Sequence, residues 1–270
     1  MDDAATLAQQ AERLSADGKW DPAVTLAKKA LDAEPAQAAA LEVMGAAASA
    51  YPARWTDEVM ARLEKARAKV ASPAERRTLT WSALGWAAFF NRLERVRELA
   101  STPELDGGEA DEAARLGALL LELGRTDEAD RALAKSKSPL AAYHRARLAE
   151  RKGDAAGARA GLQHLDAAGD AGVLREVGLA SLALREKNAA PAKALFEKRA
   201  ARTDPEETPP ALKSELLLLQ IRLALVENRR EDAEFSGQLL VASPSTADPS
   251  ALLRAVALLG PLPELTKVHE

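Results

Sequence analysis

The sequence predicts an all-α fold, and two observations carry that prediction: the kind of apolar residue it uses and the regular spacing of its helix breakers. Of the 270 residues, 47% are apolar but only 4% are aromatic, and Ile221 is the single isoleucine. Alanine and leucine dominate the apolar share and are among the best helix formers, whereas strands favour β-branched and aromatic side chains. The chain is long enough to bury a substantial core.

Residues that end helices recur along the chain roughly 17 residues apart, the length of a three- to four-turn helix plus a short turn. They are Gly18, Pro35, Pro52, Pro73, Asn91, the stretch 103–108, Gly124, Pro139, Gly153, Gly169, Asn188, Pro205, Asn228, Pro244 and Pro261. Two intervals make a helical hairpin of about 34 residues. Start signals agree with this period, because a proline follows Asp21, Ser72, Ser138 and Asp248. Such side chains can accept the free amide hydrogens of a first helical turn, where proline is tolerated.

One stretch resembles a nearly complete tetratricopeptide repeat (TPR) unit. Its matching residues are Ala11, Leu14, Gly18, Trp20, Ala23, Ala30, Leu31 and Pro35. Small residues let two antiparallel helices approach closely, and large ones fill the adjoining grooves. Partial matches follow at Trp81, Leu84 and Gly85, and at Leu116, Gly117, Gly124 and Ala129.

The resemblance implies an all-α superhelix, a solenoid of about seven TPR-like helical hairpins that forms a single domain over residues 1–270. The approximate units are 4–37, 38–71, 74–101, 109–137, 139–168, 170–203 and 209–243, with a capping helix at 249–260. Residues 101–110 and 202–210 are the softest joints, which we interpret as irregular turns within one array. Other helical-repeat families, with longer or differently punctuated units, are the alternative.

Composition argues against several classes of function. The net charge is −4, from 41 acids and 37 bases mixed along the chain, so no nucleic-acid surface is predicted. The absence of cysteine excludes disulfides, thiolate nucleophiles and cysteine zinc sites. The acidic start does not resemble a secretory signal, and the most apolar stretch, 216–226, is too short to span a bilayer. We expect a soluble cytoplasmic protein; a periplasmic location stays open if a signal was removed.

No catalytic or cofactor motif is evident, so neither an enzyme nor a cofactor is predicted. His144 and His164 could face each other within one hairpin. Two neutral ligands without a placed carboxylate make a poor metal site. We therefore expect solvated surface histidines and no metal.

The resemblance also implies that the first helices of successive hairpins line a concave face, where related proteins take peptide segments. Alignment of the units places Trp86, Phe89 and Phe90 on that face, away from the stripe around Trp81 that should face the core. Aromatic side chains there could anchor an apolar group of a partner. The alternative is that they pack against neighbouring units.

Later units place one tyrosine and four arginines on the same face: Tyr143, Arg147, Arg151, Arg185 and Arg222. Guanidinium groups along a groove could clamp the carboxylates of an acidic partner segment. The alternative is a solvated face with ion pairs along one helix, such as Arg147 with Glu150.

The sequence therefore favours a non-catalytic interaction scaffold or adaptor that binds another protein or a peptide segment, with no nucleic acid and no membrane insertion. A second hypothesis is a structural subunit of a larger envelope, secretion or motility assembly, which would use its convex surface or its ends. A third is an enzyme acting through carboxylates alone, which would need two converging acids without a counter-charge. The sequence does not set the oligomeric state.

Overall fold

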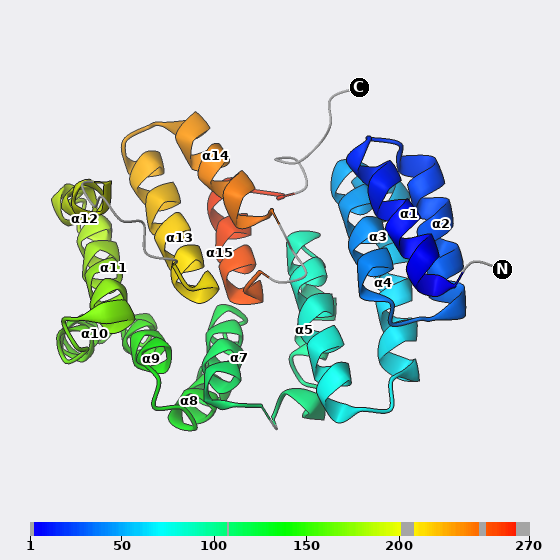
Figure 1. The fold of residues 1–270 in the computed structure, drawn as a ribbon. Coiled ribbons are helices and arrows are strands. Elements are labelled where there is room, and N and C mark those ends of the chain that lie inside the picture. The colour runs from blue at the N-terminus through cyan, green and yellow to red at the C-terminus, as the bar shows by residue number, and fades with distance from the viewer. Residues whose placement is uncertain (1–2, 107, 201–207, 243–246, 263–270) are drawn as a thin grey trace. The chain divides into compact units, whose positions relative to one another are not determined.

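The computed structural model describes residues 3–106, 108–200, 208–242 and 247–262. Across these ranges the fold is all-α, with fifteen α-helices, one 3-10 helix and no strand (Figure 1). The helices are α1 (Ala4–Ala16), α2 (Trp20–Ala33), α3 (Ala38–Ala50), α4 (Pro52–Lys69), α5 (Pro73–Phe89), α6 (Leu93–Leu99), η1 (Pro103–Leu105), α7 (Ala110–Glu122), α8 (Thr126–Ala134), α9 (Pro139–Arg151), α10 (Ala155–Gln163), α11 (Gly169–Arg185), α12 (Ala190–Ala200), α13 (Pro210–Val226), α14 (Arg230–Leu240) and α15 (Pro249–Leu259). The predicted fold class is confirmed.

Successive helices pair into hairpins, from α1 with α2 to α13 with α14. Within each compact unit, the second helix of one hairpin also packs on the first helix of the next, and neighbouring first helices touch, as α7 touches α9. In the described part of the chain this arrangement gives seven hairpins followed by α15, which confirms the predicted number of hairpins.

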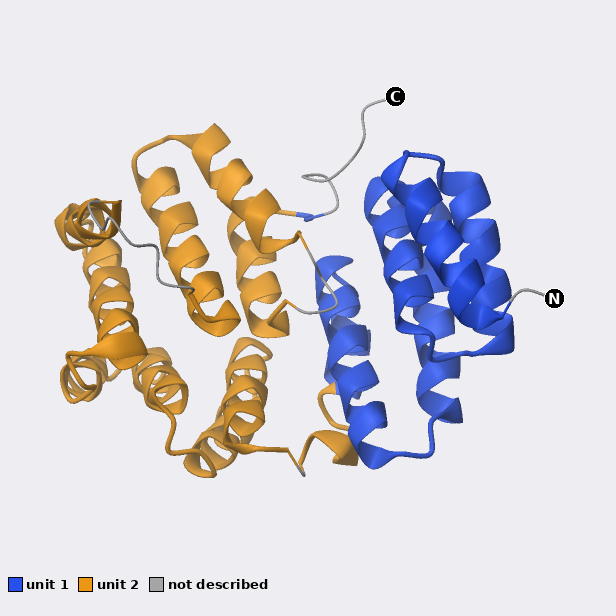
Figure 2. Ribbon diagram, in the orientation of Figure 1, with its two compact units in different colours: residues 1–99, 243–246, 261–270 blue, residues 100–242, 247–260 orange. Residues whose placement is uncertain are grey.

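The chain divides into two compact units between Leu99 and Ala100 (Figure 2). Unit 1 holds α1–α6, and unit 2 holds η1 and α7–α15. The division falls beside the segment 101–110 that the sequence marks as a soft joint. A single continuous domain stays a prediction, and the two units are described separately below.

Six of the seven described hairpins turn in the same way. In each turn one residue has a positive φ, between 55° and 87°: Gly18, Asn91, Gly124, Gly153, Lys187 or Asn228. The amide of the next residue then donates to a carbonyl five residues back, as from Lys19 N to Leu14 O (2.8 Å) and from Arg125 N to Leu120 O (2.9 Å). This pattern satisfies the last carbonyls of the first helix, and glycine adopts the required conformation without strain. The same turn conformation therefore recurs in six of the described hairpins.

Small residues let the helices approach closely in both units. A Cβ atom added at Gly45 of α3 would overlap the indole of Trp86, and one at Gly117 of α7 would crowd Leu133 of α8. Gly178 of α11 receives Leu162 of α10 in the same way. Large side chains thus fill the space that glycine leaves, as expected for closely packed antiparallel helices.

Three of the four predicted helix caps are confirmed. Ser72, Ser138 and Asp248 each accept a hydrogen bond from an amide of the following first turn, at 3.4, 3.2 and 3.0 Å. The prediction for Asp21 is wrong, because α2 begins one residue earlier, at Trp20. Asp21 instead lies within the first turn, where its negative charge favours the helix dipole.

The last described helix, α15, contacts both the end and the beginning of unit 2. It packs against α13 and α14, which precede it, and also against α7, the first α-helix of the unit. Figure 1 shows α15 beside α13, with α7 below its lower end. The first helices of unit 2 therefore surround a common interior.

Candidate functional site

The interior of unit 2 holds a connected group of ionisable side chains, which we call the polar cluster. Its members come from four helices: Glu122 of α7, Tyr143, His144 and Arg147 of α9, Glu215 of α13 and Arg254 of α15. These helices are otherwise rich in alanine and leucine. Burying charges is costly unless they are paired and hydrogen-bonded, so the contacts of each member decide what the cluster can do.

Glu215 is at the centre of the polar cluster, and its side chain is only 2% exposed. Both guanidinium Nη atoms of Arg254 donate to its two carboxylate oxygens, with Nη1 at 2.8 Å from Oε2. The hydroxyl of Tyr143 also donates to Oε2, at 2.7 Å. Burial alone would raise the pKa of Glu215, but the Arg254 charge outweighs burial and holds the pKa well below its usual range. Glu215 is therefore ionised and carries no proton to donate.

Glu122 links the cluster to the surface. It pairs with Arg147, lies 3.8 Å from Arg254 Nε, and is 3.4 Å from Arg151 Nη1. Arg151 also donates to the carbonyl of Leu121 at 2.7 Å. Burial opposes ionisation of Glu122, but the charges of Arg147 and Arg254 outweigh it and lower its pKa. Both acids of the cluster thus have arginine counter-charges.

His144 is fully buried beside these charges. Its Nδ1 lies 3.2 Å from Arg147 Nη1, so the guanidinium donates and Nδ1 accepts. The proton then resides on Nε2, which has no hydrogen-bond partner among the described residues. Burial lowers the pKa of His144 to about 3, so the ring is neutral at physiological pH.

Arg222 of α13 and Arg185 of α11 lie at the edge of the cluster. Arg222 is partly buried and lines a small cavity, about the size of one water molecule, together with Tyr143, Arg147 and Glu150. Burial lowers the pKa of Arg222, and the nearby positive charges, that of Arg254 above all, lower it further. Arg185 is exposed and pairs with Glu150 at 3.1 Å. This edge is where positive charge exceeds negative charge.

Comparison with solved structures identifies the fold. The chain is similar to a tetratricopeptide repeat protein from Parabacteroides merdae, with a TM-score of 0.55 and 16% sequence identity, over 94% of this chain and 98% of that chain. The chain has a tetratricopeptide repeat fold. No family model matches the sequence, and no curated protein matches it.

The TPR fold places the predicted site residues in two different units. The aromatics Trp86, Phe89 and Phe90 belong to α5 and its end in unit 1, and the arginines belong to unit 2. Trp86 is 2% exposed and Phe89 0%, so they do not offer anchors on a free surface. The reason is packing: Trp86 fills the space over Gly45 and meets Phe89 edge-on at 5.8 Å. We correct the prediction for Trp86 and Phe89. Phe90 is partly buried and stacks on Trp86 with ring centroids 5.6 Å apart, and its role in binding stays a prediction.

In unit 2 the TPR first helices do carry the predicted tyrosine and arginines, but these differ in exposure. Tyr143 is buried and Arg147 nearly so, both engaged in the polar cluster. Arg151 and Arg185 are exposed, and Arg222 is partly buried. The ion pairs join different helices, unlike the expected pairing of Arg147 with Glu150. Tyr143 and Arg147 are thus corrected from binding residues to interior ones.

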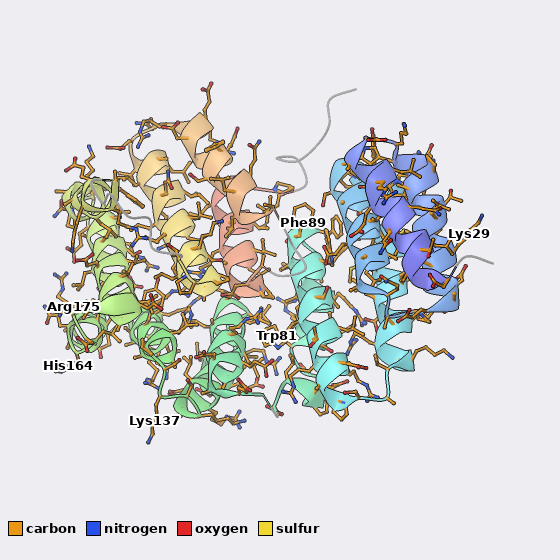
Figure 3. All side chains as sticks on the ribbon, viewed as in Figure 1. Lys29, Trp81, Phe89, Lys137, His164 and Arg175 are labelled. Carbon is orange, nitrogen blue, oxygen red and sulfur yellow. The ribbon has the colours of Figure 1, made fainter. Side chains whose placement is uncertain are left out.

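The histidine expectation is half right. His164 is exposed at the end of α10 (Figure 3), whereas His144 is buried. Within the described ranges no group of three or more histidine, cysteine or acidic side chains could hold a metal ion. A search of the same ranges finds no helix with the length and apolar character to cross a membrane.

Sequence reasoning missed Glu122, Glu215 and Arg254. A signal was present, because Glu215 is the only acid of α13 and Arg254 is the only charged residue of α15. A lone charge inside an apolar helix is rare unless it is paired. The lone arginine of α15 and the single acid of α13, a helix that also carries Lys213 and Arg222, have opposite signs and could have predicted a buried ion pair.

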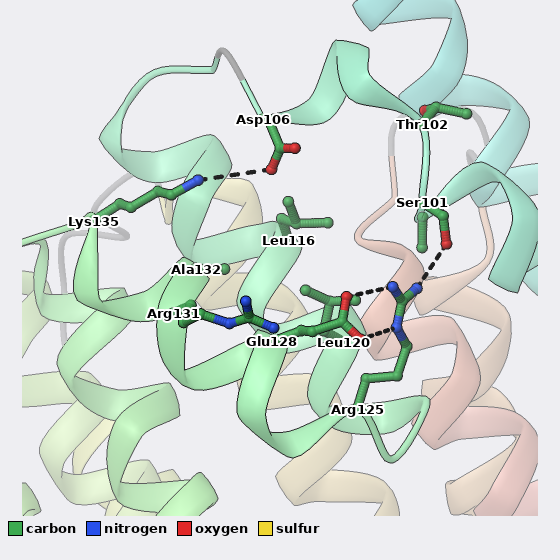
Figure 4. A pocket seen from close by; sticks show the side chains of 11 residues that line it. Ser101, Thr102, Asp106, Leu116, Leu120, Arg125, Glu128, Arg131, Ala132 and Lys135 are labelled. Atoms are coloured by element: carbon green, nitrogen blue, oxygen red, sulfur yellow. Dashed lines mark hydrogen bonds and ion pairs between the residues drawn. The ribbon is translucent and has the colours of Figure 1, made fainter.

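Unit 2 also has a larger cavity, of about 340 Å³, between the segment around η1 and helices α7 and α8 (Figure 4). Its floor is apolar, with Leu116 and Leu120. On its rim Arg125 pairs with Glu128 and donates to Ser101 at 2.8 Å. Lys135 lies 3.6 Å from an oxygen of Asp106. Arg131 also lines the cavity and donates to the carbonyl of Asp127 at 3.3 Å. Because four of the five charged lining residues are already paired with one another, we assign no ligand to this cavity.

Proposed function

We propose that this chain is a non-catalytic interaction scaffold that binds an acidic segment of another protein at the edge of the polar cluster. The binding residues are Arg151, Arg185 and Arg222, on three successive first helices of unit 2. The TPR fold supports this at a general level, because such arrays serve as scaffolds for protein–protein interaction. The acidic nature of the partner is argued from charge.

The observation that carries the proposal is the environment of Arg222. It has no ion pair among the described residues, and its pKa is lowered first by burial and then by the charges of Arg254, Arg147 and Arg185. Arg222 and the arginines of the polar cluster and its edge (Arg147, Arg151, Arg185, Arg254) make five positive charges against three glutamates (Glu122, Glu150, Glu215). A partly buried cation without a counter-charge is unfavourable, and a carboxylate from a partner would relieve it.

The exposure of Arg151 and Arg185 also supports binding at the edge of the polar cluster. Arg151 and Arg185 are about half exposed, so their guanidinium groups can turn toward a ligand while keeping Glu122 and Glu150 nearby. Arginine suits this task because its planar group binds a carboxylate through two parallel hydrogen bonds. The ion pairs of Arg151 with Glu122 and of Arg185 with Glu150 also order these two side chains in the free protein.

The test uses a fluorescein-labelled octapeptide of alternating glutamate and serine, with a glutamine version as the uncharged match. We expect the acidic peptide to bind the full chain by fluorescence anisotropy, and the affinity to fall as salt rises. Arg222→Gln should weaken binding at least about tenfold, the effect of losing one charge-assisted contact.

The matched control is Arg159→Gln. Arg159 is exposed and ion-paired like Arg185, but it lies on α10, the second helix of its hairpin. This variant should bind as the parent does. Equal binding of the acidic and glutamine peptides, or unchanged affinity in Arg222→Gln, would contradict the proposal.

A second candidate function is the structural subunit of a larger assembly. The observation that favours it is the exposure of Phe235 (60%) and Leu239 (45%), one turn apart on α14. Adjacent exposed apolar side chains often mark a protein contact. Light scattering at high protein concentration tests this candidate: self-association that Phe235→Ser abolishes would support it, and a monomer at all concentrations would count against it.

A further inference from the structure

Helix α15 is more buried and less polar than the terminal helix of a repeat array usually is. Terminal helices of repeat arrays usually present a polar outer face. Among residues 249–259, Arg254 is the only charged side chain and Ala257 is the only exposed residue. The helix is held at its start by Asp248, whose carboxylate accepts from both the amide (3.0 Å) and the hydroxyl (2.9 Å) of Ser250.

The groove that holds α15 is built around one guanidinium group. Three first helices contribute to it: α13 brings Glu215, α7 brings Glu122, and α9 brings Tyr143, which orients the Glu215 carboxylate. Arg254 is 5% exposed and makes its bidentate contact with Glu215 while its Nε faces Glu122 at 3.8 Å. We call Glu122, Tyr143 and Glu215 the arginine socket.

The socket selects for arginine in particular. A helix without an arginine in this position would cover Glu215 while leaving it only the Tyr143 hydroxyl as a direct partner, and a buried carboxylate without a counter-charge is costly. Lysine supplies a point charge and cannot make the two parallel bonds that a guanidinium makes. Apolar contacts complete the fit, through Ala251, Leu252, Ala255 and Leu259 on the buried faces of α15.

We propose that α15 is an internal ligand, and that the groove between α7 and α13 is a receptor for an apolar helix carrying one arginine. In the free chain α15 fills the groove; a partner helix with the same pattern binds by displacing it. This inference concerns the groove under α15 and a ligand of opposite charge, but the two sites share Glu122, which contacts both Arg151 and Arg254. The two proposals are therefore tested with different peptides, one acidic and one carrying an arginine.

The features of α15 fit a displaceable helix. It has eleven residues, a length at which a helix is marginal without packing, so release would cost little helix stability beyond the lost contacts. It follows the α13–α14 hairpin and is not itself one of the two helices of a described hairpin. Its partners α7, α9 and α13 each keep hairpin contacts of their own.

The experiment introduces a protease site between Ala242 and Ala247 and cleaves the purified full chain there, so that α15 is held by non-covalent contacts alone. The probe is a fluorescein-labelled synthetic peptide of residues 247–262. We expect it to exchange into the groove and to bind at least about a hundredfold more tightly than its Arg254→Ala version, with the Arg254→Lys version closer to alanine. An Ala257→Lys peptide is the matched control and should bind like the native peptide.

The receptor side is tested with Glu215→Gln in the cleaved chain, which should remove the preference for the arginine peptide. Failure of the peptide to exchange, equal affinity of the native and Arg254→Ala peptides, or loss of helicity of the whole chain on cleavage would each overturn the proposal. The last outcome would mean that α15 is part of the fold itself.

Hydrogen–deuterium exchange of the intact chain provides a second measurement. In Arg254→Lys we expect the amides of α15 to exchange about tenfold faster, with those of α9 and α11 unchanged. Acceleration of all helices of unit 2 together would contradict independent release of α15.

Discussion

Arg254 and Glu215 form a buried, doubly hydrogen-bonded ion pair across 39 residues of sequence, and this pair joins the last helix of unit 2 to the first helix of its last hairpin. Tyr143 and Glu122 extend the contact to two earlier hairpins. Repeat arrays usually depend on contacts between neighbours in sequence. Unit 2 is therefore held together by a group of long-range polar contacts in addition to the packing between neighbouring hairpins.

Removing one partner of the Arg254–Glu215 pair should destabilise the protein much more than replacing both partners by apolar residues. We expect Arg254→Ala to lower the free energy of unfolding by about 3–5 kcal/mol, because it leaves a buried carboxylate without its counter-charge. The double variant Arg254→Met, Glu215→Leu should recover most of that loss, since it removes both charges from the interior. Urea denaturation of the single and double variants measures the difference. A double variant as unstable as the single one would contradict the argument.

Acid should destabilise the fold through His144. The pKa of His144 is lowered to about 3 in the folded protein from an ordinary value of 6.5, so between these values the unfolded state binds more protons. Stability is then fully present above pH 6.5 and falls as the pH is lowered toward 3, by roughly 1.4 kcal/mol per pH unit. His144→Gln should flatten this dependence in urea titrations at several pH values. An unchanged slope would show that the ring is not the titrating group.

Trp81→Ala tests the core of unit 1. Trp81 is buried in α5, as its place in the repeat pattern predicts. We expect a loss of about 3–5 kcal/mol, as for other large-to-small core substitutions. Phe235→Ala, at an exposed aromatic, is the control and should stay within about 0.5 kcal/mol of the parent. A melting temperature for Trp81→Ala within a degree of the parent would contradict the burial.

Two helical glycines should respond oppositely to alanine. At Gly45 the new methyl group would overlap the Trp86 indole, so Gly45→Ala should cost about 1–3 kcal/mol through overpacking. At Gly161 the nearest atom, the Cβ of Ala146, would be 3.7 Å away, an ordinary contact. Gly161→Ala should therefore be neutral or stabilising by about 0.5–1 kcal/mol, from helix propensity alone. Thermal denaturation of both variants checks the contrast.

Local sequence signals predicted the hairpins well, because their physical causes are local. The turn at Gly18 needs one left-handed residue and the cap at Ser138 needs one hydroxyl, and each signal lies within a few residues of the feature it sets. A local signal can still misplace the exact end of a helix. Asp21 shows this, since α2 starts one residue before the expected cap.

The candidate site was predicted only in part. The alignment of units correctly placed Arg185 and Arg222 on first helices of unit 2. It could not tell that Trp86 would settle over Gly45, because that contact joins two hairpins whose side chains must first be packed. Nor could it show that Arg147 pairs with Glu122 and not along its own helix, since the choice depends on the distance between α7 and α9.

By itself the sequence determined the helices, their pairing into hairpins and the repeat that relates them, because helix propensity, capping and turn conformation act over one to five residues. Only the tertiary structure decided which charges are buried and which meet. Glu215 is the single acid of α13 and Arg254 is the single charge of α15, and only packing brings the two into contact. The energy of a charge depends on how much water and which counter-charges surround it.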